Sequence, residues 1–600
     1  MKLHSDLAHI TEEITTRSND LRSAYLAKIN QMVENKPNRA HLSCGNQAHA
    51  YAAMGEAKTI LAEGRTPNLG IITAYNDMLS AHQPFAEYPD LIKRAAHRAG
   101  ATAQVAGGVP AMCDGVTQGQ PGMELSLFSR DVIALSTAVA LSHNTFDAVA
   151  YLGVCDKIVP GLVIAAATFG HLPSIFLPAG PMTSGLSNDE KAITRQKYSK
   201  GEISREDLLK SEMQAYHGPG TCTFYGTANS NQMLMEFMGL HLPGSSFVNP
   251  GTPLRKALTE EGTKRILSLT SIGNEFTPVG HILDEKAFVN GIVGLMATGG
   301  STNLVIHLIA MAKAAGIVLT IEDFDKISAI VPLMARVYPN GLADVNQFHA
   351  AGGLSYIIGE LLEEGLLHDD VLTVNGNNLS SYTSEPVLKD GEVTWQQGIK
   401  TSLNEKILTS LEKPFSSTGG LKYLKGNLGE GIMKISAVDL KHHLIEAPAK
   451  VFTNQDDVKQ AFKKGMFNED SIIVVRMQGP KSNGMPELHS LTPLLSVLLG
   501  RGLKIALLTD GRMSGASGKV PAVIHTSPEA LAEGPIGKII DGDLIRLDAV
   551  AGTMDVLTEG FTARPSTLHT ALQGEGLGRE LFASFRQNIG SASTGASVIV

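Results

Sequence analysis

The chain has 600 residues, of which 43% are hydrophobic and 18% are charged, so it can bury sizeable cores and is expected to divide into two or more domains. Its formal net charge of -9 argues against binding along the phosphate backbone of nucleic acids, because that affinity comes mainly from Lys and Arg. An anionic ligand would therefore need a local basic pocket.

The N-terminal region has no feature of a targeting segment. Residues 1–20 carry acidic side chains early and contain no apolar run of signal-peptide length, and no later segment approaches about 18 uninterrupted apolar residues. We therefore expect a cytoplasmic protein without a membrane partner. Its cysteines are too sparse for a disulfide scaffold, so we expect them to be thiols or metal ligands: Cys44, Cys113, Cys155 and Cys222.

Hydrophobic periodicity separates a helical extension from an α/β domain. Residues 1–64 show helical spacing of apolar residues with charges between them, and we expect them to pack on a neighbouring domain. Short apolar runs then alternate with amphipathic helical stretches, the strand-like runs lying at 68–77, 102–115, 147–157 and 173–181. This alternation predicts a three-layer α/β/α domain with a largely parallel sheet. The charged segment 188–216 is expected to be a solvated helical excursion.

Polar residues follow three of the strand-like runs. Ligands of parallel sheets gather beyond the carboxyl ends of the strands, so one edge of the sheet can bring these residues together. They are Asn76-Asp77, Cys113-Asp114 and Cys155-Asp156-Lys157.

A change of pattern divides the chain in two. The stretch from about 373 to 400 is polar, with few apolar residues in register. Beyond it, SIIVVRMQ, KIALLTDG and GDLIRLDAVAGTMDVL are typical of strands broken by Gly-rich turns. We therefore predict an N-terminal domain over 1–382 and a smaller β-rich domain over 383–600.

Two cysteines have surroundings that suit metal binding. Cys155 is followed by Asp156 and Lys157, which places a soft sulfur ligand beside a hard oxygen ligand. Cys222 lies in a glycine-rich loop that permits close backbone approach to a cofactor. A free cysteine is nevertheless more often a small buried hydrophobe than a ligand. Cys44 keeps that interpretation, and Cys113, beside Asp114, is intermediate.

In the second domain, Glu487 ends the loop GPKSNGMPE, and Ser514 lies in the Gly-rich turn TDGRMSGASG. Taken alone, such residues are usually a surface charge and a turn former. Ser514 with His525 and Asp510 leaves a serine hydrolase as a distant alternative, although no GxSxG elbow is present. A non-catalytic binding protein is a third alternative, but it gives no reason for Cys-Asp-Lys at a strand end.

From about residue 65 to its C-terminus, the sequence resembles the dihydroxy-acid dehydratase and 6-phosphogluconate dehydratase family. The resemblance rests on motifs that follow one another in order: CDGVTQGQPGMELSLFSRDVIA (113–134), GVCDKIVPGLVIAAA (153–167), LPAGPMTSG (177–185), TCTFYGTANSNQ (221–232), GGSTNLVIHL (299–308), GGLKYLKGNLGEGIMKIS (419–436), GPKSNGMPE (479–487), TDGRMSGASG (509–518) and SASTGA (591–596).

The resemblance implies a role for each matching residue. Cys155 and Cys222 match cysteines that hold an iron-sulfur cluster, and Ser514 matches the proposed general base. The positions of a Mg²⁺ or Mn²⁺ site are matched by Asp114, Asp156, Lys157 and Glu487. Lys157 is expected to be carbamylated, because an ammonium group cannot ligate a cation whereas a carbamate supplies an anionic oxygen. The family likeness also implies a swivelling β-barrel-like C-terminal domain and a homodimer.

One departure bears on the cluster. The 2Fe-2S members carry a further cysteine in a Pro-Cys-Asn-like motif, and the matching stretch, NDMLSAHQPF (76–85), has none. Either Cys113 is recruited, or a hydroxide, His82 or another group completes the site. A 4Fe-4S cluster with one open iron suits two or three cysteines better than a 2Fe-2S cluster.

The motifs also bear on the substrate. TAYNDMLSAHQPF and AMCDGVTQGQPGMELSLFSRD look more like the phosphogluconate branch of the family than the branched-chain amino-acid branch. The resemblance therefore implies a hydro-lyase acting on a phosphorylated sugar acid, with 6-phosphogluconate as the expected substrate. The alternative within the family is a dehydratase of dihydroxy acids or unphosphorylated aldonates.

Overall fold

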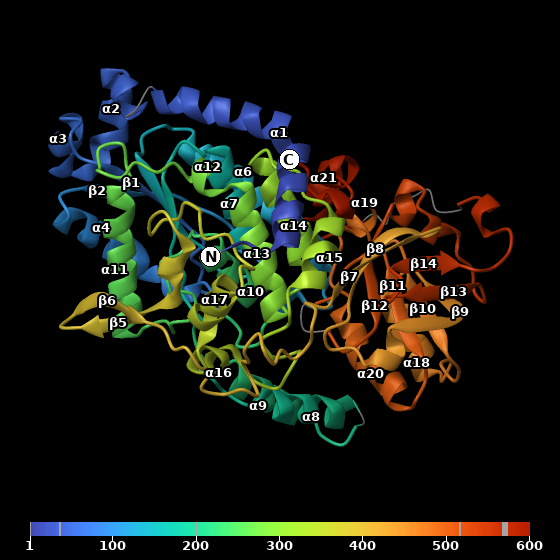
Figure 1. Ribbon diagram of the computed structural model, residues 1–600. Helices are drawn as coiled ribbons and strands as arrows, with labels where there is room; N and C mark the ends of the chain where they lie inside the picture. Colours follow the sequence, from blue (N-terminus) through green and yellow to red (C-terminus); the bar gives the residue numbers. More distant parts are fainter. Residues whose placement is uncertain (1, 35–37, 200, 515–517, 567–573) are drawn as a thin grey trace.

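The computed structural model describes residues 2–34, 38–199, 201–514, 518–566 and 574–600 (Figure 1). An α/β body built on a parallel sheet is followed by a second body built on a closed β-barrel. This architecture confirms the predicted fold class. None of the described helices combines the length and apolar character that crossing a membrane requires.

The sheet of the first body has four parallel strands in the order β2-β1-β3-β4. Its central strand β3 is buried along its whole length, as expected where helices cover both faces of a sheet. The strands are β1 (Asn68–Thr73), β2 (Thr102–Gly108), β3 (Ala148–Leu152) and β4 (Ser174–Phe176).

Helices cover both faces of this sheet. The chain leaves β1 toward one edge through α4 (Tyr88–Arg98), and then crosses to the other edge through α6 (Ser126–Leu141) and α7 (Ile158–Thr168). Connections between parallel strands are right-handed. A connection that runs toward one edge of the sheet therefore places its helix on one face, and a connection toward the other edge places its helix on the opposite face. Helix α11 (Pro253–Ser268) packs beside α4, and α7 packs beside α6. The predicted three layers are therefore present.

Further helices enlarge the core of the first body. Helix α10 is buried along its whole length, and it packs against α13 and α14. The principal helices of this layer are α10 (Thr227–Phe237), α13 (Glu285–Thr298), α14 (Leu304–Ala314), α15 (Ile321–Ile330) and α17 (Gly353–Glu363).

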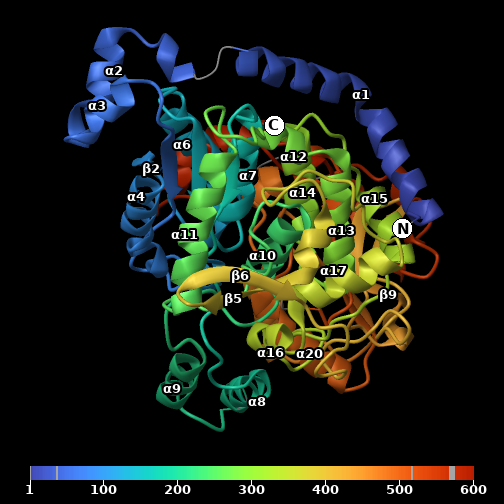
Figure 2. The same cartoon turned by 60° about the vertical axis from the view of Figure 1, so that its left-hand side comes forward.

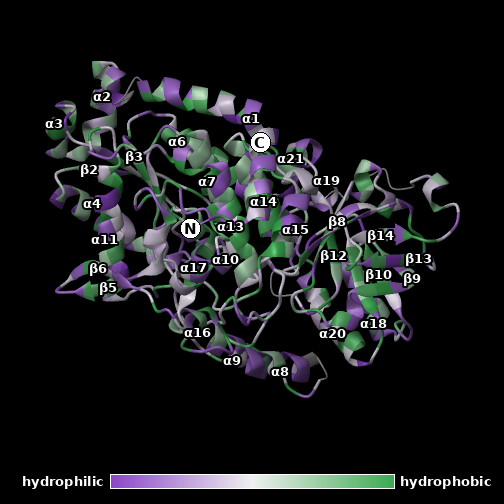
Figure 3. Cartoon of the chain, in the orientation of Figure 1, coloured by the Kyte–Doolittle hydropathy of each residue, from purple (hydrophilic) through white to green (hydrophobic). Residues whose placement is uncertain are grey.

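Two helical segments lie outside this core. Helix α1 (Ser5–Glu34) crosses the surface against α12 (Val279–Ile282), α13 and α15, as Figure 2 shows. The charged helices α8 (Asn188–Ser199) and α9 (Arg205–Ala215) pack on each other at the periphery. Figure 3 colours α8 mostly hydrophilic and the interior helix α13 mostly hydrophobic.

The second body is a barrel of eight strands in the order β10-β11-β12-β8-β7-β14-β13-β9. Closure removes the free sheet edges that would otherwise expose unpaired backbone groups. The strands are β7 (Leu421–Gly426), β8 (Gly429–Lys434), β9 (Leu444–Phe452), β10 (Ser471–Val475), β11 (Ile505–Thr509), β12 (Ala522–Ser527), β13 (Leu544–Asp548) and β14 (Thr553–Val556).

Strand β10 illustrates how the barrel is packed. Ile472 and Val474 belong to the apolar cluster inside the barrel, whereas Ile473 and Val475 belong to the larger cluster outside it. Successive side chains of a strand point to opposite faces, so a strand covered on both sides must be apolar at every position. This explains the continuous apolar run that the sequence shows here.

A hairpin, β5 (Ser384–Lys389) and β6 (Glu392–Gln397), lies between the two bodies in sequence. It packs on α11, and the Trp395 indole N–H donates to the Pro243 carbonyl at 3.1 Å. The hairpin thus contacts the first body, although it follows residue 382. The division at 382/383 stays a prediction.

The contact between the bodies can be tested at Gly484, which has φ 68°. A Cβ there would lie 2.1 Å from the Glu124 carbonyl oxygen of the first body. Gly465 has φ 69° but open space around it. Gly465→Ala should cost only the left-handed backbone penalty of about 1–2 kcal/mol. Gly484→Ala should lower the thermal midpoint further, because the backbone of Glu124 must also move. Equal losses in thermal unfolding would contradict this account of the contact.

Candidate functional site

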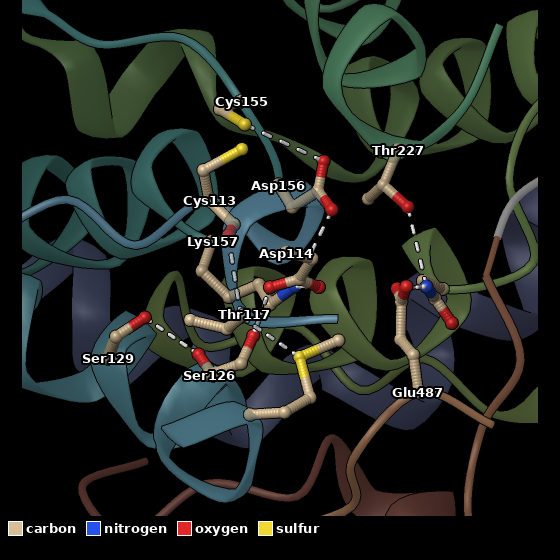
Figure 4. A network of polar contacts seen from close by, with 12 residues as sticks. Cys113, Asp114, Thr117, Ser126, Ser129, Cys155, Asp156, Lys157, Thr227 and Glu487 are labelled. Carbon is tan, nitrogen blue, oxygen red and sulfur yellow. Dashed lines mark hydrogen bonds and ion pairs between the residues drawn. The ribbon is translucent and has the colours of Figure 1, made fainter. Parts of the chain in front are cut away.

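The site is built where the strands of the parallel sheet end. Cys113 and Asp114 follow β2, with Cys113 at the N-cap position of the short helix α5 (Asp114–Thr117). Cys155, Asp156 and Lys157 follow β3 and lead directly into α7. The structure therefore brings together two of the three polar strand ends that the sequence singles out (Figure 4).

The polar residues at the third strand end make hydrogen bonds within their own turn. Asp77 is exposed and accepts a hydrogen bond from the Tyr75 hydroxyl at 2.6 Å. The Asn76 side chain accepts from the Leu79 amide at 3.0 Å and thereby stabilises its own turn. Asp77 is therefore not among the carboxylates whose oxygens lie close together in the described residues.

Two thiols face each other at the centre of the site. The side chains of Cys113 and Cys155 point toward one another in Figure 4, and the Cys155 thiol lies 3.9 Å from Asp156 Oδ1. Hydrogen bonding between the thiols lowers the pKa of Cys113 and raises that of Cys155. Cys155 has φ 75°, a conformation that costs a non-glycine residue of order 1–3 kcal/mol and that clusters at functional sites.

Cys222 is the third thiol of this group. Asn229 holds its loop, with Nδ2 donating to the Cys222 carbonyl at 2.6 Å and to the Phe224 carbonyl at 2.8 Å. Burial raises the pKa of Cys222 to about 12, and a negative charge on Cys113 would raise it further. A negative charge on Cys222 would likewise raise the pKa of Cys155.

These three thiols fit an iron-sulfur cluster. They are free cysteines, they are close enough for their charges to interact, and they offer the soft sulfur donors that such clusters use. Cys44 is exposed at the start of α2 (Cys44–Tyr51), in the helical extension. His82 is buried, and burial lowers its pKa to about 4.

Three carboxylates form a second group beside the thiols. Ligand oxygens of Asp114, Asp156 and Glu487 all lie within 4.8 Å of one another. The Lys157 ammonium forms an ion pair with Asp114 and lies 3.5 Å from Asp156. Arg512 donates to Glu487 at 2.6 Å and to Asp114 at 3.2 Å. Glu487 and Arg512 come from the barrel, so the group joins both bodies.

The carboxylates differ in how far the neighbouring cations offset the effect of burial on their pKa values. Burial alone would raise the pKa of Asp114, but Lys157 and Arg512 outweigh it and hold that pKa below its usual range. Burial raises the pKa of Asp156 despite Lys157. It also raises the pKa of Glu487 to about 8 despite Arg512. Two buried acids and one partly buried acid, facing two cations, fit a divalent ion with oxygen ligands.

Sequence reasoning missed the residues that position these groups. Arg512 is fully buried and donates through Nε to the Met485 carbonyl at 2.7 Å, which fixes the loop before Glu487. Asn303 donates to Glu487 at 3.0 Å, and Ser126 hydrogen-bonds Asp114. Arg512 lies two residues before Ser514, and its place in that turn was the one available signal.

Ser514 follows β11, and it lines a cavity with Lys434 and Thr302. A hydrolase triad is not formed among the described residues. Burial lowers the pKa of His525 to about 3, and neither of its ring nitrogens has a hydrogen-bond partner. The Asp510 carboxylate instead accepts hydrogen bonds from the backbone amides of Met477, Gln478 and Ala530.

Comparison with known proteins gives two family matches. Residues 66–382 match the model of the dihydroxy-acid/6-phosphogluconate dehydratase N-terminal region, and residues 406–596 match the model of the C-terminal region. A phosphogluconate dehydratase of Rhizobium meliloti is 59% identical over all of both chains. That of Escherichia coli K12 is 55% identical over the same extent. A dihydroxy-acid dehydratase of Sulfurisphaera tokodaii is 35% identical over 87% of this chain and 89% of its own.

The importance of Arg512 can be measured as stability. Arg512→Met leaves Glu487 and Asp114 without their shared guanidinium, and breaking a buried ion pair typically costs about 3–5 kcal/mol. The control is Arg546→Met, which removes the exposed pair with Glu446 and should cost at most about 1 kcal/mol. Unfolding of metal-free protein in denaturant measures both. A loss for Arg512→Met no larger than that of the control would refute this role.

Proposed function

This chain belongs to the dihydroxy-acid/6-phosphogluconate dehydratase family, and we propose that it is a hydro-lyase that converts 6-phospho-D-gluconate to 2-dehydro-3-deoxy-6-phosphogluconate and water. This is the dehydration step of the Entner-Doudoroff pathway. The observation that carries the assignment is the full-length identity of 55% and 59% with phosphogluconate dehydratases, against 35% with a dihydroxy-acid dehydratase.

We propose that Cys113, Cys155 and Cys222 hold an iron-sulfur cluster. The facing thiols of Cys113 and Cys155 support this assignment, together with the charge interactions that link Cys222 to both. The hydrogen bond between Cys113 and Cys155 favours Cys113 over His82 as the third ligand. Three cysteines leave one iron of a 4Fe-4S cluster open, so this type is preferred to 2Fe-2S.

We propose that Asp114, Asp156 and Glu487 bind Mg²⁺ or Mn²⁺, with Lys157 as a further ligand after carbamylation. Their mutual spacing supports this proposal. Lys157 lies between Asp114 and Asp156, where a carbamate would add an anionic oxygen to the set. When bound, the cluster and the ion supply two electron-pair acceptors, one for the departing hydroxyl and one for the carboxylate end of the substrate.

The residues of the chain supply the proton chemistry. Ser514 Oγ takes the proton from C2, and the resulting enol becomes the ketone of the product. A serine hydroxyl is a feeble base until it is ionised, so it needs help from a neighbouring group. The buried setting of Asp114, Glu487 and Arg512 excludes water and strengthens the charge interactions that orient the substrate.

The runner-up is a dehydratase of dihydroxy acids or unphosphorylated aldonates, which would use the same site. The cytoplasmic location and the homodimer inferred from the family likeness stay predictions.

Substrate choice and the role of Ser514 can be tested together. Anaerobically purified protein should dehydrate 6-phosphogluconate in preference to gluconate and 2,3-dihydroxyisovalerate, measured as 2-keto acid formation. Ser514→Ala should reduce kcat by at least about 10²–10⁴-fold while the absorbance of the cluster is unchanged. Preference for another acid would overturn the substrate, and an active Ser514→Ala variant would remove Ser514 from the role of base.

The cluster ligands can be tested with a matched cysteine control. Cys113→Ser, Cys155→Ser and Cys222→Ser should each bleach the iron-sulfur absorbance and lower the iron content, because a serine is a poor substitute for thiolate. Cys44→Ser should retain both, because Cys44 is exposed in the helical extension. Colour that persists in both Cys155→Ser and Cys222→Ser would refute the ligand assignment.

A further inference from the structure

Lys434 reaches from the barrel into the first body. It is the last residue of β8 and is 9% exposed. Its Nζ donates to the Gly299 carbonyl at 2.8 Å and to the Gly300 carbonyl at 2.9 Å. The loop that it contacts continues to Asn303, which donates to Glu487. Lys434 is therefore attached to the same loop that holds a carboxylate of the proposed metal site.

Lys434 and Ser514 line one cavity. Its volume is about 30 Å³, which is room for a water molecule between polar groups. Thr302 adds a second hydroxyl, and the other lining residues are glycine or apolar: Met513, Gly518, Val520, Ala522 and Ile524. Ser514 thus shares a small, largely apolar space with a lysine.

The surroundings of Lys434 favour its neutral form. Among the described residues that line the cavity none is a carboxylate, and no described acid forms an ion pair with Lys434. An unpaired ammonium is costly to bury, and burial lowers the pKa of Lys434 to about 7. A neutral amine has two N–H groups, which match the two glycine carbonyls, and its lone pair is left to accept a proton.

We propose that Lys434 activates Ser514, its amine nitrogen accepting the Oγ proton directly or through one water in the shared cavity. This inference rests on the proposed function, because it assigns Ser514 as the base. In this proposal Lys434 acts on Ser514, and Ser514 acts on the substrate.

The proton balance closes over one turnover. The Ser514 O–H bond breaks and an N–H bond forms, which leaves an alkoxide and an ammonium. The alkoxide then takes the C2 proton, and the electron pair of the C–H bond stays on the substrate. Hydroxide leaves C3, and the proton held by Lys434 is returned through solvent to form water. The net change is the loss of one water from the substrate.

An arginine substitution separates this role from two simpler ones. Lys434 can also serve as a clamp between the bodies, or as a fixed positive charge beside Ser514. Lys434→Arg would keep the charge and donors for both carbonyls, but a guanidinium stays protonated and cannot accept a proton. The clamp and the fixed charge therefore predict that this variant is active, whereas a proton acceptor predicts that it is inactive.

The test compares Lys434→Arg and Lys434→Ala with Lys425→Met, which removes an exposed lysine from the neighbouring strand β7. In holoenzyme, both Lys434 variants should lose at least about 10²-fold in kcat with little change in KM, while Lys425→Met keeps the wild-type rate. The wild-type kcat should fall as the pH drops below about 7, because protonated Lys434 cannot accept a proton, and this limb should be absent from the residual activity of Lys434→Arg. Added methylamine or ethylamine should partly restore Lys434→Ala.

Lys434→Arg within about fivefold of the wild-type kcat would overturn the inference, as would an unchanged acid limb in that variant. Failure of the proposed function has a different signature, since then the wild type would not dehydrate 6-phosphogluconate or Ser514→Ala would remain active. Should Lys434→Ala not fold, Lys434→Arg decides the question by rate and pH profile. Iron content and thermal midpoint identify any variant that has merely lost its structure.

Discussion

Three carboxylates, two of them buried and one partly buried, meet within 4.8 Å of one another and repel, and the site depends on the positive charges that offset this repulsion. Lys157 and Arg512 supply two positive charges, and both form ion pairs with Asp114. Two positive charges cannot offset three carboxylates equally. The pKa of Asp114, which pairs with both cations, is lowered, whereas burial keeps the pKa of Glu487 raised. A divalent ion would complete the balance with the oxygen ligands that it prefers. The ends of the strands, the contact between the two bodies and the proposed metal site all meet at this group of carboxylates.

The same group of carboxylates lies at the contact between the two bodies. Asp114 and Asp156 lie at the carboxyl ends of the parallel sheet, whereas Glu487 and Arg512 lie on loops of the barrel. Arg512 reaches Asp114 across the contact, and Lys434 reaches back to the loop before Asn303. Proper docking of the barrel is therefore a condition for a complete site. Under the proposed assignment, the loops of the barrel would contribute Glu487 and Ser514, while residues at the ends of the sheet strands would supply most of the metal ligands.

The local sequence pattern predicted the strands and helices better than it predicted which side chains contact each other across the fold. The alternation of apolar runs and the polar residues after them predicted the parallel sheet and the meeting of Cys113 with Cys155, because strand ends share an edge. It did not separate Asp77 from the carboxylates that meet, since the exposure of Asp77 and its hydrogen bond with Tyr75 leave no periodic signal in the sequence. Arg512 and Lys434 were missed because their contacts join residues far apart in the chain. The roles of the cluster and metal residues came from family resemblance, and they stay predictions.

The most direct test of this account is anomalous diffraction from crystals of anaerobically purified protein grown with Mn²⁺. Maps recorded at the manganese and iron edges would locate both elements independently of any activity assay. We expect a manganese peak bounded by Asp114, Asp156 and Glu487, and iron peaks among the sulfurs of Cys113, Cys155 and Cys222. Iron bound elsewhere or absent, or manganese outside the three carboxylates, would contradict the central claim that two distinct metal groups meet at this edge of the sheet.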